Sequence, residues 1–293
     1  MKLYIGLTTY HLLSACTIVK INHEKNSELL IEGVTEQEPE LVNRIREANI
    51  FSNVYYVDQT EAWHKINELE ADTDGENIDE AVKYAVEFWT GRFVHFKNIM
   101  RRYSSINIWD DHFTLGMALA FLRIPYNYYE DSPGCNYRRE IFIDLSRNHV
   151  TNKAFAPTSL HYGLRGSYPY AVSINYDFDL NPMERGERDK DFSLVKSLKE
   201  LKRLSPEDFY QIKRIFAPDG YFVKEQNYSS RKGNFLLMGQ HYSDSLYKNV
   251  NMIRYVLFML ADYFGEDMNL WIKNHPANNF NPMQAWFPDA GVV

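Results

Sequence analysis

The sequence predicts an α/β protein built from two Rossmann-like domains, the second of them short. Three observations lead to this fold class. Short apolar runs alternate with helical patterns through the first half of the chain, which is typical of a doubly wound parallel sheet. A polar, basic segment at 229–233 precedes a second strand–helix–strand pattern. The length of 293 residues exceeds what one hydrophobic core usually spans.

The first domain is assigned to residues 1–180. Strands are predicted where short apolar runs occur, and helices where apolar residues recur every three or four positions. The predicted strands are 3–7, 29–31, 54–57, 106–109 and 126–129, and the predicted helices are 10–21, 78–102, 113–122 and 135–145.

The rest of the chain divides into a helical linker segment, residues 181–232, and a second domain, residues 233–293. A helix is expected over 194–216, because Ser205-Pro206-Glu207-Asp208 is a good helix start. The second domain contains predicted strands at 235–238 and 269–272 around a helix at 251–264. A nucleotide-binding α/β half usually takes about 100–150 residues, so the second domain is expected to be reduced or truncated.

Composition narrows the function classes. The formal net charge of −7 gives the chain no general attraction to nucleic acid. Two basic pairs, Arg101-Arg102 and Arg138-Arg139, could form a local patch or lie solvated on helix faces. The two cysteines suit a reducing cytoplasm, and no apolar run approaches the roughly 18 residues that span a bilayer.

Chemistry-bearing residues are expected after the strands, because a doubly wound parallel sheet binds ligands beyond the carboxyl ends of its strands. In the first domain these positions hold Thr8-Thr9-Tyr10-His11, Asp58, Asp110-Asp111 and the acidic pair Glu130-Asp131. A carboxylate there can act as a general base. The alternative is that an acidic pair after a strand caps the next helix.

The second domain repeats this arrangement with basic and amide groups. Gly239 and Gln240 follow its first strand, and the motif Lys273-Asn274-His275-Pro276 ends its second. An imidazole can protonate a leaving phosphate, and a lysine can neutralise it. The alternative is that a histidine before proline is an ordinary turn residue.

These motifs together resemble the bacterial sialyltransferases of lipooligosaccharide and capsule synthesis, including glycosyltransferase family 52 and the polysialyltransferases. That group shares an acidic D/E-D/E-G motif, matched here by Glu130-Asp131-Ser132, and a later His-Pro motif, matched by His275-Pro276. The opening segment 7–13 is similar to the family's first strand, loop and helix. The resemblance implies a GT-B fold, in which two Rossmann-like domains face a cleft.

The resemblance also implies a reaction: metal-independent, inverting transfer of sialic acid from CMP-sialic acid to a surface polysaccharide or lipooligosaccharide. No cofactor is expected. Asp131 would be the base and His275 the acid; Glu130 is the alternative base, because Ser132 stands where the family has glycine. Donor binding would fall to the residues at the other strand ends, which are Lys273, Asn274, Pro276, Gly239, Gln240, Thr8 and Thr9.

The expected partners are a nucleotide-sugar donor, a glycan acceptor that can be lipid-linked, and a second copy of the chain. The expected location is the cytoplasm or the inner face of the cell membrane. One departure leaves alternatives open: the family has a serine pair in its donor domain, but no Ser or Thr follows Pro276. The chain could therefore be a GT-B transferase for another nucleotide sugar, or a catalytically incomplete relative that acts as a binding subunit in polysaccharide assembly.

Overall fold

Two compact units, Met1–Phe216 and Ala217–Val293, make up the computed structural model of the chain. Each unit is described by itself. The structure describes residues 1–33, 39–71, 78–111, 113–130, 166, 170–176, 191–194, 200–218, 233–238, 268–273 and 291–292.

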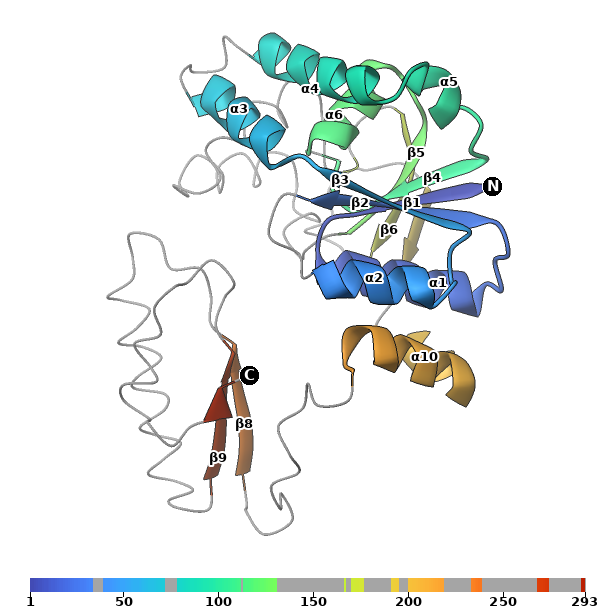
Figure 1. The fold of residues 1–293 in the computed structure, drawn as a ribbon, viewed down its shortest axis with the longest axis vertical. Coiled ribbons are helices and arrows are strands. Elements are labelled where there is room, and N and C mark those ends of the chain that lie inside the picture. Colours follow the sequence, from blue (N-terminus) through green and yellow to red (C-terminus); the bar gives the residue numbers. More distant parts are fainter. Residues whose placement is uncertain are drawn as a thin grey trace. The chain divides into compact units, whose positions relative to one another are not determined.

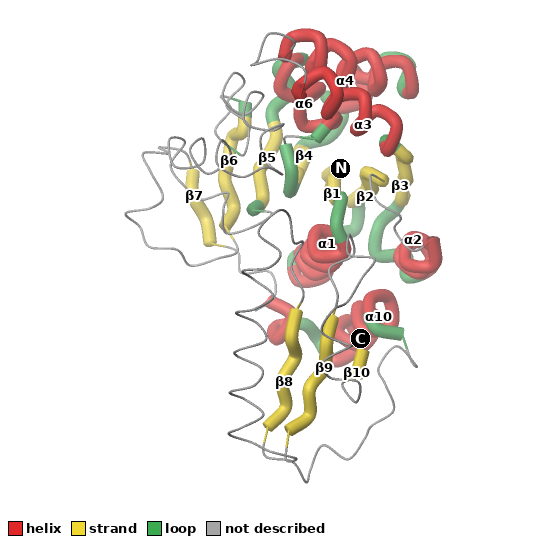
Figure 2. Tube along the Cα trace, turned by 90° about the vertical axis from the view of Figure 1, so that its left-hand side faces the viewer, coloured by secondary structure: helices red, strands yellow, loops and turns green. Residues whose placement is uncertain are grey.

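A parallel sheet forms the centre of the first unit. Within the described residues it has seven strands in the order β3-β2-β1-β4-β5-β6-β7 (Figures 1 and 2). The order reverses direction between β1 and β4, which is the topological switch point of a Rossmann fold. The strands are β1 (Lys2–Gly6), β2 (Ser27–Gly33), β3 (Asn53–Asp58), β4 (Ser105–Ile108), β5 (Tyr126–Tyr129), β6 (Ala171–Tyr176) and β7 (Asp191–Leu194).

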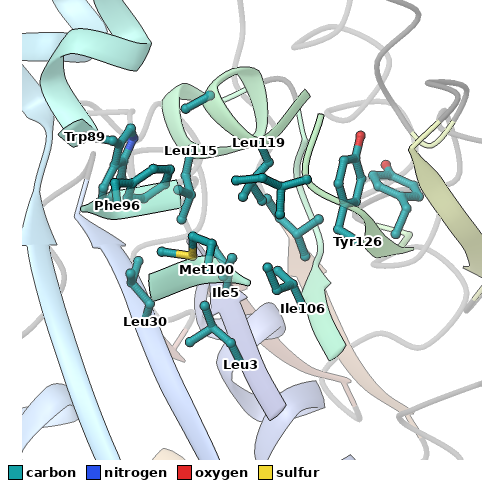
Figure 3. Close-up of a cluster of buried hydrophobic side chains, with 14 of the residues drawn as sticks. Leu3, Ile5, Leu30, Trp89, Phe96, Met100, Ile106, Leu115, Leu119 and Tyr126 are labelled. Carbon is teal, nitrogen blue, oxygen red and sulfur yellow. The ribbon is translucent and has the colours of Figure 1, made fainter. Parts of the chain in front are cut away.

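Helices cover both faces of this sheet (Figure 1). On one face lie α1 (Thr9–Ile21) and α2 (Pro39–Glu47), and on the other lie α3 (Thr60–Ala71), α4 (Ile78–Arg92), α5 (Phe96–Met100) and α6 (Thr114–Phe121). Each face has its own hydrophobic core. Trp89, Phe96, Leu115 and Tyr126 belong to the core on the α6 side, which Figure 3 shows.

Two of the predicted helices differ from those observed. The helix expected over 78–102 is broken, because His95 adopts a left-handed backbone (φ 62°) between α4 and α5. The helix expected over 194–216 begins later, since Leu194 ends strand β7; the short 3-10 helix η4 (Leu201–Arg203) and α10 (Pro206–Phe216) follow. The expected helices 135–145 and 251–264 lie outside the described residues.

Helix α10 packs on the first unit, although the sequence placed it in a linker segment over 181–232. Its Ile212 and Ile215 are buried in the core on the α1 side. Arg44 Nε donates to the Ile215 carbonyl oxygen at 2.6 Å, and Lys20 Nζ lies 2.9 Å from Asp208 Oδ1. The boundary between the two units therefore follows α10, at Phe216.

The described strands of the second unit are β8 (Gly233–Met238), β9 (Met268–Lys273) and β10 (Gly291–Val292), parallel and in the order β10-β9-β8 (Figure 2). Met238 pairs with Lys273 in the register of β8 and β9. The chain therefore leaves both strands at the same edge of this small sheet, toward Gly239 from one strand and Asn274 from the other. No helix in the described part of the chain is long and apolar enough to cross a membrane.

Candidate functional site

Four buried carboxyl groups mark the carboxyl edge of the first sheet. Glu32 is the second-last residue of β2, Asp110 and Asp111 follow β4, and Glu130 follows β5. Their exposed fractions are 1%, 5%, 0% and 1%. Burying a carboxyl group costs free energy unless hydrogen bonds or charges compensate it. Acidic groups retained at the ligand-binding edge of a doubly wound sheet therefore indicate a functional site.

Asp111 is held rigidly at this edge. Its Oδ2 accepts hydrogen bonds from Tyr126 Oη at 2.7 Å and from the Gly166 backbone N–H at 2.8 Å. Helix α6 starts directly against the same turn: a Cβ added to Gly116 would lie 2.2 Å from the Asp111 carbonyl oxygen. Glycine is therefore needed at position 116 for this close approach of two backbones.

Glu32 lies in a buried polar network that joins three elements. Its Oε1 accepts from Gln59 Nε2 at 2.9 Å and from the Leu115 backbone N–H at 3.4 Å. Burial, with a smaller contribution from the charge of Asp110, raises the pKa of Glu32 to about 8. The Glu32 carboxyl is therefore protonated at neutral pH and can donate a hydrogen bond.

The network continues away from Glu32. Thr114 Oγ1 donates to Gln59 Oε1 and accepts from Trp89 Nε1, the latter bond being 2.8 Å long. The start of α6, the residue after β3 and the last turn of α4 are thus tied together beneath the carboxyl edge. This arrangement provides a rigid base for the acidic residues above it.

The turn between β1 and α1 supplies the other predicted groups of the first unit. Thr8 caps α1 by accepting from the His11 backbone N–H at 3.3 Å. His11 Nδ1 accepts from the backbone N–H groups of Leu7 and Thr8, at 3.2 and 3.3 Å. An accepting Nδ1 carries no proton, so a neutral His11 holds its proton on Nε2. Thr8 and Thr9 are exposed at the N-terminus of α1, where a ligand can reach them.

An aromatic column crosses the same edge. The ring of Trp109, which follows β4, stacks on His11 at a centroid distance of 6.0 Å and on Tyr129 at 4.7 Å. The carboxyl ends of β1, β4 and β5 are thereby joined by side-chain packing. His11 was expected at this edge, whereas Trp109 and Glu32 were not predicted as site residues. Strand β2 also contains Ser27 and Glu28, so no local sequence pattern distinguishes Glu32 as a site residue.

The structure describes only some of the predicted site residues. Glu130 is buried at the carboxyl edge, and its backbone N–H donates to the Asn175 carbonyl oxygen at 2.8 Å. Thr8 and Thr9 lie at the same edge, and Lys273 ends β9 in the second unit. Lying outside the described residues are Asp131, His275, Asn274, Pro276, Gly239 and Gln240. Their roles therefore stay predictions. Among the described residues, no group of three His, Cys, Asp or Glu side chains could hold a metal ion.

Comparison with known proteins identifies the fold. No protein-family model matches the chain, and no curated protein matches it significantly. Among solved structures, the UDP-GlcNAc 2-epimerase of Neisseria meningitidis bound to UDP-GlcNAc aligns with a TM-score of 0.56 and 12% identity, covering 100% of this chain and 72% of that one. The S. aureus MnaA–UDP structure also aligns with a TM-score of 0.56 and 12% identity, covering 100% and 68%.

A third alignment is weaker. A 2,6-sialyltransferase of Photobacterium sp. in complex with CMP and lactose has a TM-score of 0.48 and 13% identity, covering 100% of this chain and 62% of that one. This likeness supports no further argument. The first two show that the chain has a GT-B-like, Rossmann-type α/β fold, which confirms the predicted fold class.

Proposed function

We propose that this chain is an enzyme acting on nucleotide sugars and, more specifically, a glycosyltransferase that moves sialic acid from CMP-sialic acid to a surface glycan. The buried acidic edge of the first sheet carries the proposal. Carboxyl groups retained here despite the cost of burial mark this edge as the ligand-binding edge of the sheet, and an accessible carboxylate next to them could remove a proton from a sugar hydroxyl.

We assign the base to Asp131. Glu130 is 1% exposed, whereas a general base must touch the acceptor hydroxyl. Glu130 is therefore assigned to positioning the neighbouring Asp131. In the reaction, Asp131 takes the proton of the acceptor hydroxyl, whose oxygen forms the new bond to the anomeric carbon. The bond from that carbon to the CMP phosphate breaks, and inversion follows from displacement on the opposite side.

The second unit would bind the donor. Its parallel strands β8 and β9 lead, at one edge, into Gly239-Gln240 and Asn274-His275-Pro276. His275 would protonate the departing phosphate, and Lys273 would neutralise part of its charge. Both roles rest on the sequence motif, since the side chains of this region are not described.

A second candidate is an enzyme that uses a UDP-sugar. It is favoured by the two solved structures with a TM-score of 0.56, one of them bound to UDP-GlcNAc and the other to UDP. The two candidates differ in the nucleobase of the donor, which is cytosine in CMP-sialic acid and uracil in a UDP-sugar. The preference of the protein for CMP or UDP therefore decides between them.

The test uses the full chain and two measurements. Isothermal titration with CMP and UDP gives the nucleotide preference, and CMP release from CMP-sialic acid with a panel of glycans gives turnover. We expect CMP to bind and to be released. We also expect His275→Asn to lower turnover with little change in CMP affinity, while His64→Asn, an exposed histidine on α3, changes neither. Binding of UDP but not CMP would favour the second candidate, and binding of neither would overturn the enzymatic proposal.

A further inference from the structure

The opposite edge of the first sheet carries a group of cations. Arg101 and Arg102 follow α5 and precede β4, and Arg123 follows α6 and precedes β5. Strands β4 and β5 are neighbours, with Asn107 paired to Asn127, so the segments that enter them lie side by side. All three arginines are exposed, and Lys97 on α5 is half-buried. We call Lys97, Arg101, Arg102 and Arg123 the amino-edge basic surface.

The segment of the sequence that contains these cations has few acidic residues. From Phe88 to Tyr129 the chain has five Lys or Arg residues, and its only acids are Asp110 and Asp111, which are buried at the carboxyl edge. None of the four cations forms an ion pair with another described residue. The whole chain has a net charge of −7, so this surface has the opposite sign to the protein as a whole.

Two acids at the amino edge, Glu24 and Glu28, have other partners. Glu24 Oε1 lies 2.5 Å from Lys2 Nζ. Glu28 is buried and accepts hydrogen bonds from Tyr103 Oη at 2.5 Å and Asn53 Nδ2 at 2.8 Å. Glu24 is thus paired with a cation outside the amino-edge basic surface, and Glu28 is buried against Tyr103 and Asn53, so neither carboxylate forms an ion pair with that surface.

Exposed apolar side chains accompany these cations. Val94, three residues before Lys97, is 75% exposed, and Phe121, two residues before Arg123, is 49% exposed. Single exposed apolar residues are common on protein surfaces. Next to a group of cations, however, they match the chemistry of a lipid interface, where basic groups contact headgroups and apolar groups enter the outer part of the bilayer.

We propose that the amino-edge basic surface, with Val94 and Phe121, docks this protein on an anionic membrane. A nucleic acid would need more cations, since strong electrostatic binding uses roughly six to ten phosphate contacts. The carboxyl edge lies at the other end of the same strands. A membrane bound at the amino edge therefore does not block the carboxyl edge. The inference does not depend on which sugar, if any, the protein transfers.

Each cation near an anionic bilayer contributes about a fivefold gain in membrane affinity. Removing two should therefore weaken binding by about 25-fold, and removing one by about fivefold. Added salt should weaken binding further, because the headgroup field is screened within about 10 Å at moderate ionic strength.

The experiment is co-sedimentation of the full chain with vesicles of phosphatidylcholine alone and of phosphatidylcholine mixed with phosphatidylglycerol. We expect binding to the mixed vesicles only. Arg101→Gln/Arg102→Gln should lose about 25-fold in affinity. The matched control, Lys213→Gln/Arg214→Gln, removes two exposed cations from α10 and should leave binding unchanged. Val94→Ser should weaken the binding that persists at high salt.

Four results would overturn the proposal: no binding of the unaltered chain, equal binding to both kinds of vesicle, equal losses in the two double variants, or tighter binding to a duplex oligonucleotide than to the mixed vesicles. Circular dichroism of each variant checks the fold. The substituted side chains are exposed, so their removal should not change the spectrum.

Discussion

The two edges of the first sheet differ in the sign and in the exposure of their charged side chains. At the carboxyl edge Glu32, Asp111 and Glu130 are almost completely buried, while at the amino edge Arg101 and Arg123 are exposed. Burial of a carboxyl group opposes folding, whereas an exposed arginine costs the fold little. The difference indicates that the acids are held in place at a cost in stability and that the cations are free to meet a partner. Substitutions at the two edges should therefore separate activity, stability and membrane binding.

The largest effect is expected from the acidic pair. If Asp131 is the base, Asp131→Asn should lower CMP release by about 10²–10⁴-fold, the usual contribution of general base catalysis. Initial rates at saturating donor measure this. The control is Asp58→Asn, because Asp58 is an exposed acid at the end of β3 whose Oδ1 accepts from the Thr60 N–H, a bond that asparagine can keep. Equal losses in both variants would contradict a specific role for Asp131.

The next effect concerns the backbone contact beneath the carboxyl edge. Gly116→Ala would place a Cβ 2.2 Å from the Asp111 carbonyl oxygen. Backbone atoms cannot move aside as a flexible side chain can, so we expect a loss of about 3 kcal/mol in the free energy of unfolding. Urea unfolding followed by fluorescence of the buried Trp89 and Trp109 measures it.

Gly91 on α4 is the matched glycine. A Cβ there would meet nothing within 4 Å, so Gly91→Ala should stabilise the first unit by about 0.5–1 kcal/mol through helix propensity. If both alanine variants are tolerated alike, the turn at Asp111 does not pack against α6 as described.

A third effect is a pH dependence of stability caused by Glu32. Its pKa of about 8 in the folded protein lies above the ordinary value of 4.5. Between these values the folded state holds a proton that the unfolded state has released. Rising pH therefore favours unfolding, by up to about 1.4 kcal/mol for each pH unit. Below about pH 4.5 this contribution to the pH dependence disappears.

Glu32→Gln removes that dependence while keeping an oxygen that can accept from Gln59 and Leu115. We expect the variant to gain stability relative to the unaltered chain as the pH rises from 5 toward 8, measured by urea unfolding at several pH values. Glu68→Gln, on an exposed residue of α3, should give a constant difference across this range. A constant difference for Glu32→Gln as well would show that Glu32 is ionised in the folded protein.

The smallest effect on stability is expected at the amino edge. Arg101→Gln/Arg102→Gln should change the free energy of unfolding by less than about 0.5 kcal/mol, because both side chains are exposed. The same variant is expected to lose membrane binding. A large loss of stability would mean that these arginines belong to the fold, and it would remove the contrast between the two edges.

Part of this architecture follows from local sequence patterns. The strands β1, β3, β4 and β5 are short apolar or aromatic runs separated by helical patterns, and the residues directly after β4 and β5 were predicted to lie at a ligand-binding edge. Alternation of strands and helices makes the sheet parallel, because a crossover helix returns the chain to the same end of the sheet. These features depend on neighbouring residues and can be derived from the sequence alone.

Other parts depend on residues distant in the chain, and the sequence pattern did not predict them. Strand β6 (Ala171–Tyr176) contains Ser173 and Asn175, and Ser173 Oγ donates to Asn127 Oδ1 at 2.8 Å. The Ser173 hydroxyl is hydrogen-bonded to a residue of β5, 46 residues earlier in the chain. Because β6 contains such polar residues, it does not form the continuous apolar run from which a strand would be predicted. Likewise, the sequence placed α10 in a linker segment, whereas its Ile212 and Ile215 pack in the hydrophobic core on the α1 side.

The sequence by itself determined the α/β class, the positions of β1 to β5 along the chain, and the acidic pair Glu130-Asp131 after β5. Only the tertiary structure decided that Glu32 belongs to the same edge and holds a proton. Its partners Gln59 and Leu115 lie 27 and 83 residues away, and the pKa of a carboxyl group depends on its burial and on nearby charges. Both are properties of the packed protein, so no local pattern in the sequence contains them.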